Sequence, residues 1–359
     1  MSELSVWQEL LEEFRALGGR AENVRLGQGK FGRGLFPIDP SRAVDLHTPE
    51  NLLFPVDALF FQSGNLRVNP SSKAGAREIA WFERYAAELS WGGDGRRDAE
   101  RFICGMRELP PEVRTELGNG FGLDYCLAPM SEDLIENYFL SARAIAYHET
   151  DSETGPPDSR STPAHKKAGK VIMPLIELAN FGDEATFEFD RGVSLHGVFK
   201  DEVLVRYGRQ DTLGLFQGWG FTLERPVAFS RCLSMSTPFG KLVVQRQLAK
   251  EKPREIPGVG SVLMPRLAAE GSVVTLSSLM LGNRQAPRIP RGIFQCLFRE
   301  AGLPGADEIF DQIRHTNVLA FLNLLEMLEG AAGPQAASLR AMARLQLTTI
   351  AHCYGSRPM

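Results

Sequence analysis

Residues 173–182 read MPLIELANFG, residues 202–208 read EVLVRYG, and residues 216–221 read FQGWGF. The first two stretches are apolar runs, and they end near an asparagine and a tyrosine that is followed by glycine. Short apolar runs bounded by turn-forming residues are typical of buried strands. Asn180 and Tyr207 therefore fall where strands give way to loops, and functional side chains are often found at such positions.

A glycine-rich stretch precedes these runs. Residues 27–32, GQGKFG, satisfy the pattern GxGxxG. A dinucleotide-binding fold needs a helix at the last glycine, but Pro37 and Pro40 follow too soon for one. A kinase would add a DFG triplet, and the nearest sequence here is Asn180-Phe181-Gly182, which lacks the metal-binding aspartate. A tight turn between strands remains an open alternative.

The three opening stretches fall in the order and spacing of the C-terminal half of a SET domain, and resemble the branch of the Rubisco large-subunit lysine methyltransferases. Gly32-Arg33-Gly34 resembles the glycine turn at the N-terminal side of that family's domain. Arg143 stands where the family keeps an arginine. The matching positions of the C-terminal half are Pro174, Glu177, Asn180, Tyr207, Gly208, Gly220 and Phe221.

The sequence departs from the family pattern at three places. Phe181 replaces the histidine that follows the asparagine. Asp211 and Thr212 occupy the segment where the family has a further asparagine, and Trp219 replaces a tyrosine. These changes put catalytic activity in question, although Phe181 matters less if that position offers mainly backbone groups to a cofactor.

The resemblance implies an α+β protein with a SET β-fold: small sheets, a threaded pseudoknot, a helical insert and a helical C-terminal domain. We expect an N-terminal helix in residues 1–19 and a SET domain in 20–225, with the insert at about 71–140. Residues 226–359 would be a mainly helical, substrate-binding-like domain.

Apolar periodicity predicts the individual elements independently of the resemblance. Asp211 would cap a short helix, and residues 151–168 are polar and rich in Ser, Thr and Pro, which is typical of a surface loop. Helices are expected at 2–17, 73–90, 97–108, 131–147, 211–217, 306–329 and 335–352, and a strand pair at 186–190 and 193–199.

Methyl transfer from a sulfonium to an amine needs alignment, exclusion of water and tolerance of positive charge rather than a protein nucleophile. The resemblance gives Tyr207 the catalytic phenol and makes Trp219 and Phe221 the lining of an apolar substrate tunnel. Ordinary core packing is the alternative for these aromatic residues. The cofactor would be S-adenosyl-L-methionine, and its binding residues would be Gly32, Arg33, Gly34, Arg143, Asn180 and Phe181.

The expected function is therefore S-adenosylmethionine-dependent methylation of a lysine on a protein substrate. A protein histidine target, or a degenerate SET-fold binding protein without activity, is the alternative. A net charge of −4 without a long basic run gives little support to nucleic-acid or membrane binding. The five scattered cysteines form no CxxC pair, so we expect reduced thiols in a cytoplasmic protein and no metal site.

Overall fold

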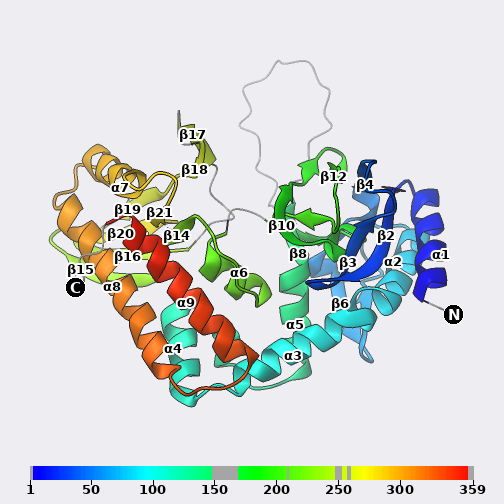
Figure 1. Cartoon of the computed structure of the whole chain (residues 1–359), viewed down its shortest axis with the longest axis horizontal. Helices are drawn as coiled ribbons and strands as arrows, with labels where there is room; N and C mark the ends of the chain where they lie inside the picture. The colour runs from blue at the N-terminus through cyan, green and yellow to red at the C-terminus, as the bar shows by residue number, and fades with distance from the viewer. Residues whose placement is uncertain (1–2, 148–168, 208–209, 247–252, 257–259, 355–359) are drawn as a thin grey trace. The chain divides into compact units, whose positions relative to one another are not determined.

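The computed structural model describes residues 3–147, 169–207, 210–246, 253–256 and 260–354. They form two compact units, one from residues 1–100 and 135–207 and the other from 101–134 and 208–359. Both units combine helices with small sheets, which confirms the predicted α+β class (Figure 1). The predicted polar loop at 151–168 lies outside the described residues.

The strands of the first unit form several small sheets. A four-stranded sheet has the order β1-β4-β12-β11, and its β11–β12 pair is the predicted strand pair. The strands β10 and β13 pair in parallel, whereas β2 and β3 form an antiparallel hairpin. The bounds are β1 Arg20–Glu22, β2 Val24–Gly29, β3 Gly32–Pro37, β4 Val44–Pro49, β5 Phe54–Pro55, β6 Leu59–Gln62, β7 Asn65–Val68, β8 Ala144–Tyr147, β9 Gly169–Ile172, β10 Asn180–Ala185, β11 Glu188–Phe189, β12 Gly192–Gly197 and β13 Leu204–Val205.

Two helices pack aromatic side chains into the core of this unit. They are α1, Glu3–Ala16, and α2, Ala76–Glu88. The fully buried rings of Trp81 and Tyr85 stack with centroids 5.5 Å apart, and Trp81 Nε1 donates to the Leu10 oxygen at 3.1 Å. The ring of Phe14 in α1 lies 5.3 Å from the Trp81 ring between centroids, so this contact and the hydrogen bond to Leu10 fix α2 against α1.

The helical stretch between residues 71 and 143 differs in detail from the prediction. The helices α3, Arg96–Arg107, and α5, Glu132–Arg143, each cross the boundary between the two units. The predicted helix 131–147 was too long, because residues 144–147 pair with β9 instead. The helix α4, Pro111–Phe121, was not predicted, since Gly118 and Gly120 lower its helix propensity.

Residues 227–283 of the second unit form strands, whereas the sequence predicted a mainly helical domain at 226–359. Four of the strands form a sheet of order β15-β16-β20-β19, in which β16 and β20 run parallel. The helix α6, Thr212–Trp219, confirms the predicted short helix. The other bounds are β14 Val227–Phe229, β15 Leu233–Thr237, β16 Gly240–Gln245, β17 Pro253–Ile256, β18 Gly260–Leu263, β19 Arg266–Glu270, β20 Val273–Ser277, β21 Met280–Asn283, α7 Ile289–Glu300, α8 Ala306–Met327 and α9 Pro334–His352.

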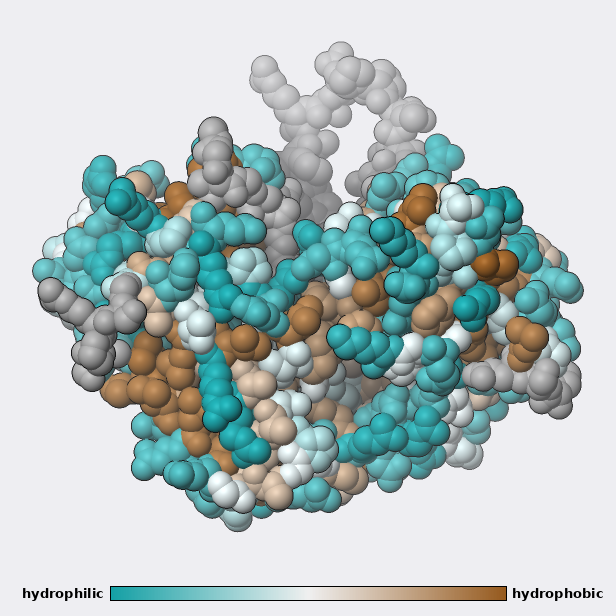
Figure 2. All heavy atoms as spheres, in the orientation of Figure 1, coloured by the Kyte–Doolittle hydropathy of each residue, from teal (hydrophilic) through white to brown (hydrophobic). Residues whose placement is uncertain are grey.

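The helices α8 and α9 pack side by side, in agreement with the two C-terminal helices that the sequence predicted. One face of α8 is buried, including Phe310, Ile313 and Phe321. The other face exposes Leu319 and Leu322, and Figure 2 shows hydrophobic atoms gathered over the second half of α8. No described helix is both long enough and apolar enough to cross a membrane.

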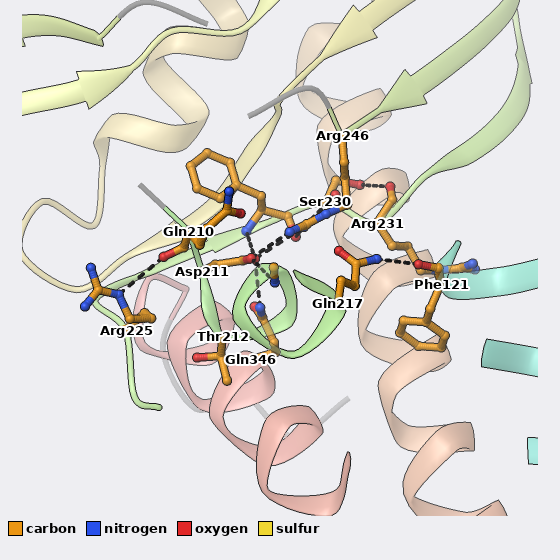
Figure 3. A network of polar contacts seen from close by, with 12 residues as sticks. Phe121, Gln210, Asp211, Thr212, Gln217, Arg225, Ser230, Arg231, Arg246 and Gln346 are labelled. Atoms are coloured by element: carbon orange, nitrogen blue, oxygen red, sulfur yellow. Dashed lines mark hydrogen bonds and ion pairs between the residues drawn. The ribbon is translucent and has the colours of Figure 1, made fainter. Parts of the chain in front are cut away.

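A buried carboxylate, Asp211, joins four elements of the second unit (Figure 3). It caps α6 by accepting from Gly214 N at 2.8 Å, and it accepts from Phe229 N at 2.8 Å. Arg246 pairs with it at 2.7 Å, and Gln346 Nε2 donates to it at 2.7 Å. Asp211 is fully buried, so every oxygen lone pair must find a donor inside the protein. The predicted capping role is confirmed, and the same residue also links α6 to β14, β16 and α9.

Candidate functional site

The glycine-rich stretch is a β-hairpin rather than a phosphate-binding loop. Gly27 pairs with Gly34, and Gly29 pairs with Gly32, so these glycines share one face of the hairpin. Gly32 has a φ of +94° at the turn, a conformation that side-chain-bearing residues rarely adopt. The glycines thus leave the turn end of this face without Cβ atoms; we call it the bare face, although the Phe36 ring lies over Gly27 and Gly29.

The carboxylate of Glu202 occupies that bare face. A Cβ atom added to Gly34 would lie 2.4 Å from Glu202 Oε1, and one added to Gly29 would lie 2.7 Å from Oε2. Glu202 is only 7% exposed. Its neighbour Val203 donates its N–H to the Leu35 oxygen at 2.8 Å, which ties the segment to β3. The packing of this buried carboxylate therefore requires glycine at 34, and at 29 it does so together with the Phe36 ring, which also lies 2.7 Å from an added Cβ.

Asn180 is the first residue of β10, and its side chain links this strand to the glycine hairpin. Its Nδ2 donates to the Arg33 backbone oxygen at 3.2 Å and to Glu202 Oε1 at 2.5 Å. Both amide hydrogens are used by these acceptors, and no described residue donates to its Oδ1. The predicted cofactor residues Asn180, Arg33 and Gly34 are thus brought together.

Tyr207 follows β13 and lies next to Phe181 of β10. The two rings meet edge-on with centroids 5.4 Å apart. The Tyr207 hydroxyl donates to the Ala179 backbone oxygen, which fixes the direction of the phenol. The surrounding protein removes water from the phenol and raises the pKa of Tyr207 to about 12, so the group is neutral at physiological pH.

A second buried carboxylate, Glu177, lies close enough to Tyr207 to act on its pKa. The Tyr85 hydroxyl donates to Glu177 Oε1 at 2.8 Å and accepts from Leu175 N at 3.1 Å. Glu177 Oε2 is buried without a hydrogen-bond partner. Arg143 NH1 donates to the backbone oxygen of Glu177 at 2.9 Å rather than to its carboxylate. No described residue forms an ion pair with Glu177 or Glu202, although the Arg143 guanidinium lies close enough to Tyr207 to act on its pKa.

Several predicted residues have roles that the sequence did not show. The Arg33 side chain points toward the end of α2, where it donates to the Leu89 oxygen and lies 3.4 Å from Asp94, so that its backbone oxygen faces Asn180. The importance of Glu202 was not predicted either. A single glutamate before an apolar strand gives no sign that it is buried.

Trp219 and Phe221, the predicted tunnel residues, belong to the second unit. Trp219 is the last residue of α6, and both side chains are half-buried. Thr212, which stands where the family has an asparagine, donates its hydroxyl to the Leu223 oxygen at 2.9 Å. The structure thus gives Thr212 a hydrogen bond within the second unit, while the tunnel role of Trp219 and Phe221 stays a prediction.

Within the described part of the chain, no group of three or more His, Cys, Asp or Glu side chains is arranged to hold a metal ion. The site of the first unit brings together the carboxylates of Glu177 and Glu202, the neutral phenol of Tyr207 and the amide of Asn180.

No protein-family model matches the chain, and no curated protein matches it. Among solved structures, it is similar to the SET domain of LSMT bound to lysine and AdoHcy, with 13% identity over 96% of this chain and 89% of that chain and a TM-score of 0.40. It is also similar to Rubisco LSMT bound to sinefungin and monomethyllysine, with 15% identity, coverage of 96% and 90%, and a TM-score of 0.39. TM-scores below 0.5 are too low to transfer the role of any residue to this chain. Both solved structures are of the family that the sequence motifs resemble.

Proposed function

We propose that the protein is an S-adenosylmethionine-dependent methyltransferase that acts on a protein lysine. One observation carries the proposal: Asn180 bridges the glycine hairpin and Glu202, while Tyr207 is anchored by Ala179, the residue before Asn180. Segments distant in sequence thereby form one polar site beside an aromatic pair.

The charges of this site fit the proposed cofactor. S-adenosylmethionine supplies an electrophilic methyl on a sulfonium and also carries an ammonium group. Glu177 has a buried carboxylate oxygen without a partner, and Glu202 is buried without an ion pair. Because buried charges are costly unless compensated, a cationic ligand would be stabilised by these residues.

The residues then have distinct roles in the proposed reaction. Asn180 and the backbone of residues 32–34 would bind the cofactor, and Arg143 would pair with its carboxylate. Tyr207 is neutral at physiological pH and so would not act as a base; its oxygen would orient the amine and the methyl through weak polar contacts. Trp219 and Phe221 would line the route of the lysine side chain.

Two measurements test the proposal. Calorimetry should detect S-adenosylmethionine binding, and cofactor at 100 times its Kd should stabilise the protein by about 2.7 kcal/mol. Tritiated methyl from the cofactor should enter protein in a cell extract, and the label should disappear when the extract's lysines are first blocked by acetylation, which removes the nucleophilicity of the amine. Label that persists and is recovered in histidine would replace lysine by histidine as the target.

A second candidate is a SET-fold protein that binds its partner without catalysis. Phe181 favours it, because an apolar, buried side chain stands where the family has a histidine. Cofactor binding without any methyl transfer would support this alternative. The pseudoknot and the substrate-binding role of residues 226–359 also stay predictions from the resemblance.

A further inference from the structure

The bare face of the hairpin, described above, holds a carboxylate that forms no ion pair with any residue the structure describes. Glu202 is 7% exposed, and no cationic side chain pairs with it among the described residues. The nearest arginine along the hairpin, Arg33, directs its guanidinium to Asp94 and Leu89 instead. A carboxylate that is kept buried and unpaired costs stability, so its retention points to a use.

Glu202 and the Arg33 backbone oxygen together fix which way the Asn180 amide faces. Glu202 Oε1 accepts from Asn180 Nδ2 at 2.5 Å. The Arg33 oxygen is a second acceptor for the same nitrogen, at 3.2 Å. Both acceptors lie on the Nδ2 side of the planar amide. Oδ1, on the other side, therefore remains available as a hydrogen-bond acceptor.

We propose that Glu202 is a positioning residue that makes the site selective for a ligand bearing an amino group, by locking the Asn180 oxygen outward and by adding a negative charge behind it. This inference rests on the proposed function, and the ligand group it assigns is the α-ammonium of the cofactor. An ammonium has only donors, so it fits an amide oxygen backed by a carboxylate.

The test compares three ligands on the full-length protein: S-adenosylmethionine, S-adenosylhomocysteine, and an S-adenosylhomocysteine analogue without the α-amino group. Glu202→Gln keeps the shape of the side chain and removes its charge. We expect it to weaken the first two ligands by about tenfold, the scale of one charge-assisted hydrogen bond, and to leave the Kd of the amino-free analogue within twofold.

Two further variants sharpen the comparison. Glu202→Asp keeps the charge but withdraws it by one methylene, so its loss of affinity should lie between wild type and Glu202→Gln. Asp201→Asn removes the same charge from the exposed neighbouring residue and should change none of the three dissociation constants. If Glu202→Gln does not fold, the ratio of Kd values in Glu202→Asp alone tests the inference, since selectivity for the amino group must fall there too.

The outcomes separate the inference from the function on which it rests. Wild type that binds none of the three ligands overturns both. Wild-type binding with equal losses for all three ligands in Glu202→Gln would mean a merely structural role and overturn the inference alone. A loss of affinity confined to S-adenosylmethionine would mean that the Glu202 charge acts on the sulfonium and not on the amino group. That result would also overturn the inference.

Discussion

The hydroxyl of Tyr207 donates a hydrogen bond to the backbone oxygen of Ala179, and this contact directs the phenol oxygen toward the segment that carries Asn180. The bond links a residue that follows β13 to the residue that precedes β10, the parallel neighbour of β13. A phenol held in this way is preorganised, and its neutral state follows from a pKa of about 12.

Replacing Tyr207 by phenylalanine should separate catalysis from packing. The ring contact with Phe181 is kept and one oxygen is lost, so we expect a stability change of about 1 kcal/mol but a turnover about 100-fold lower. Methyl transfer, melting and cofactor affinity should be measured on one preparation. Full activity in this variant would reject the catalytic assignment.

Gly34→Ala should displace two side chains of the site, because the added Cβ would lie too close to them. Its Cβ would lie 2.4 Å from Glu202 Oε1 and 2.6 Å from Asn180 Nδ2, so both side chains must move. We expect a loss of about 1–3 kcal/mol in the free energy of unfolding, together with weaker cofactor binding. Gly292→Ala is the matched control: it lies in α7 with open space around its Cβ and should stabilise by about 0.5–1 kcal/mol. Equal effects at both glycines would contradict the packing argument.

Tyr85→Phe should lower the free energy of unfolding by more than the removal of one exposed hydroxyl would. It leaves the N–H of Leu175 without its acceptor and Glu177 Oε1 without its donor, both in the buried core. We expect about 2–3 kcal/mol of destabilisation by denaturant titration. Tyr147→Phe removes a hydroxyl that donates to Glu50, an exposed residue whose oxygen water can reach, so it should cost no more than about 1 kcal/mol. A Tyr85 variant as stable as wild type would show that water replaces the lost contacts.

Asp211→Asn should destabilise the second unit by about 3–5 kcal/mol, because it leaves the buried guanidinium of Arg246 without its counter-charge. Asp307→Asn breaks a pair with Arg291 at an exposed carboxylate and is the control, with little expected effect. Removing both members with Asp211→Leu and Arg246→Met should destabilise less than the sum of the two single changes. Strict additivity would show that the two charges do not interact.

The titration of Asp211 should make the free energy of unfolding depend on pH. Burial raises the pKa of Asp211, but Arg246 and the N–H donors of Phe229 and Gly214 more than offset it, so the folded-state pKa is lowered. A lowered folded-state pKa means that the charge stabilises the fold above the unfolded value of about 3.8 and that this stability is lost as the pH falls below it. Denaturation from pH 6 to pH 2 should show this loss in wild type and a shallower one in Asp211→Asn.

Much of the secondary structure was predictable from local pattern. The helix at α9, Pro334–His352, begins at a proline in its first turn and carries regular apolar spacing. The helix capped by Asp211 was predicted from a single capping residue. The strands of residues 227–283 were missed, because their short alternating runs become strands only when neighbouring strands satisfy their backbone groups.

The ordered motifs around Asn180 and Tyr207, the glycines of the hairpin and the C-terminal helices were determined by the sequence itself, since each depends on residues close together in the chain. Only the tertiary structure decided that the Arg33 side chain turns away, that Glu202 fills the bare face of the hairpin and that Asn180 presents its oxygen. These facts depend on contacts between residues as far as 147 positions apart. Burial and the orientation of an amide are properties of such contacts, and no local pattern encodes them.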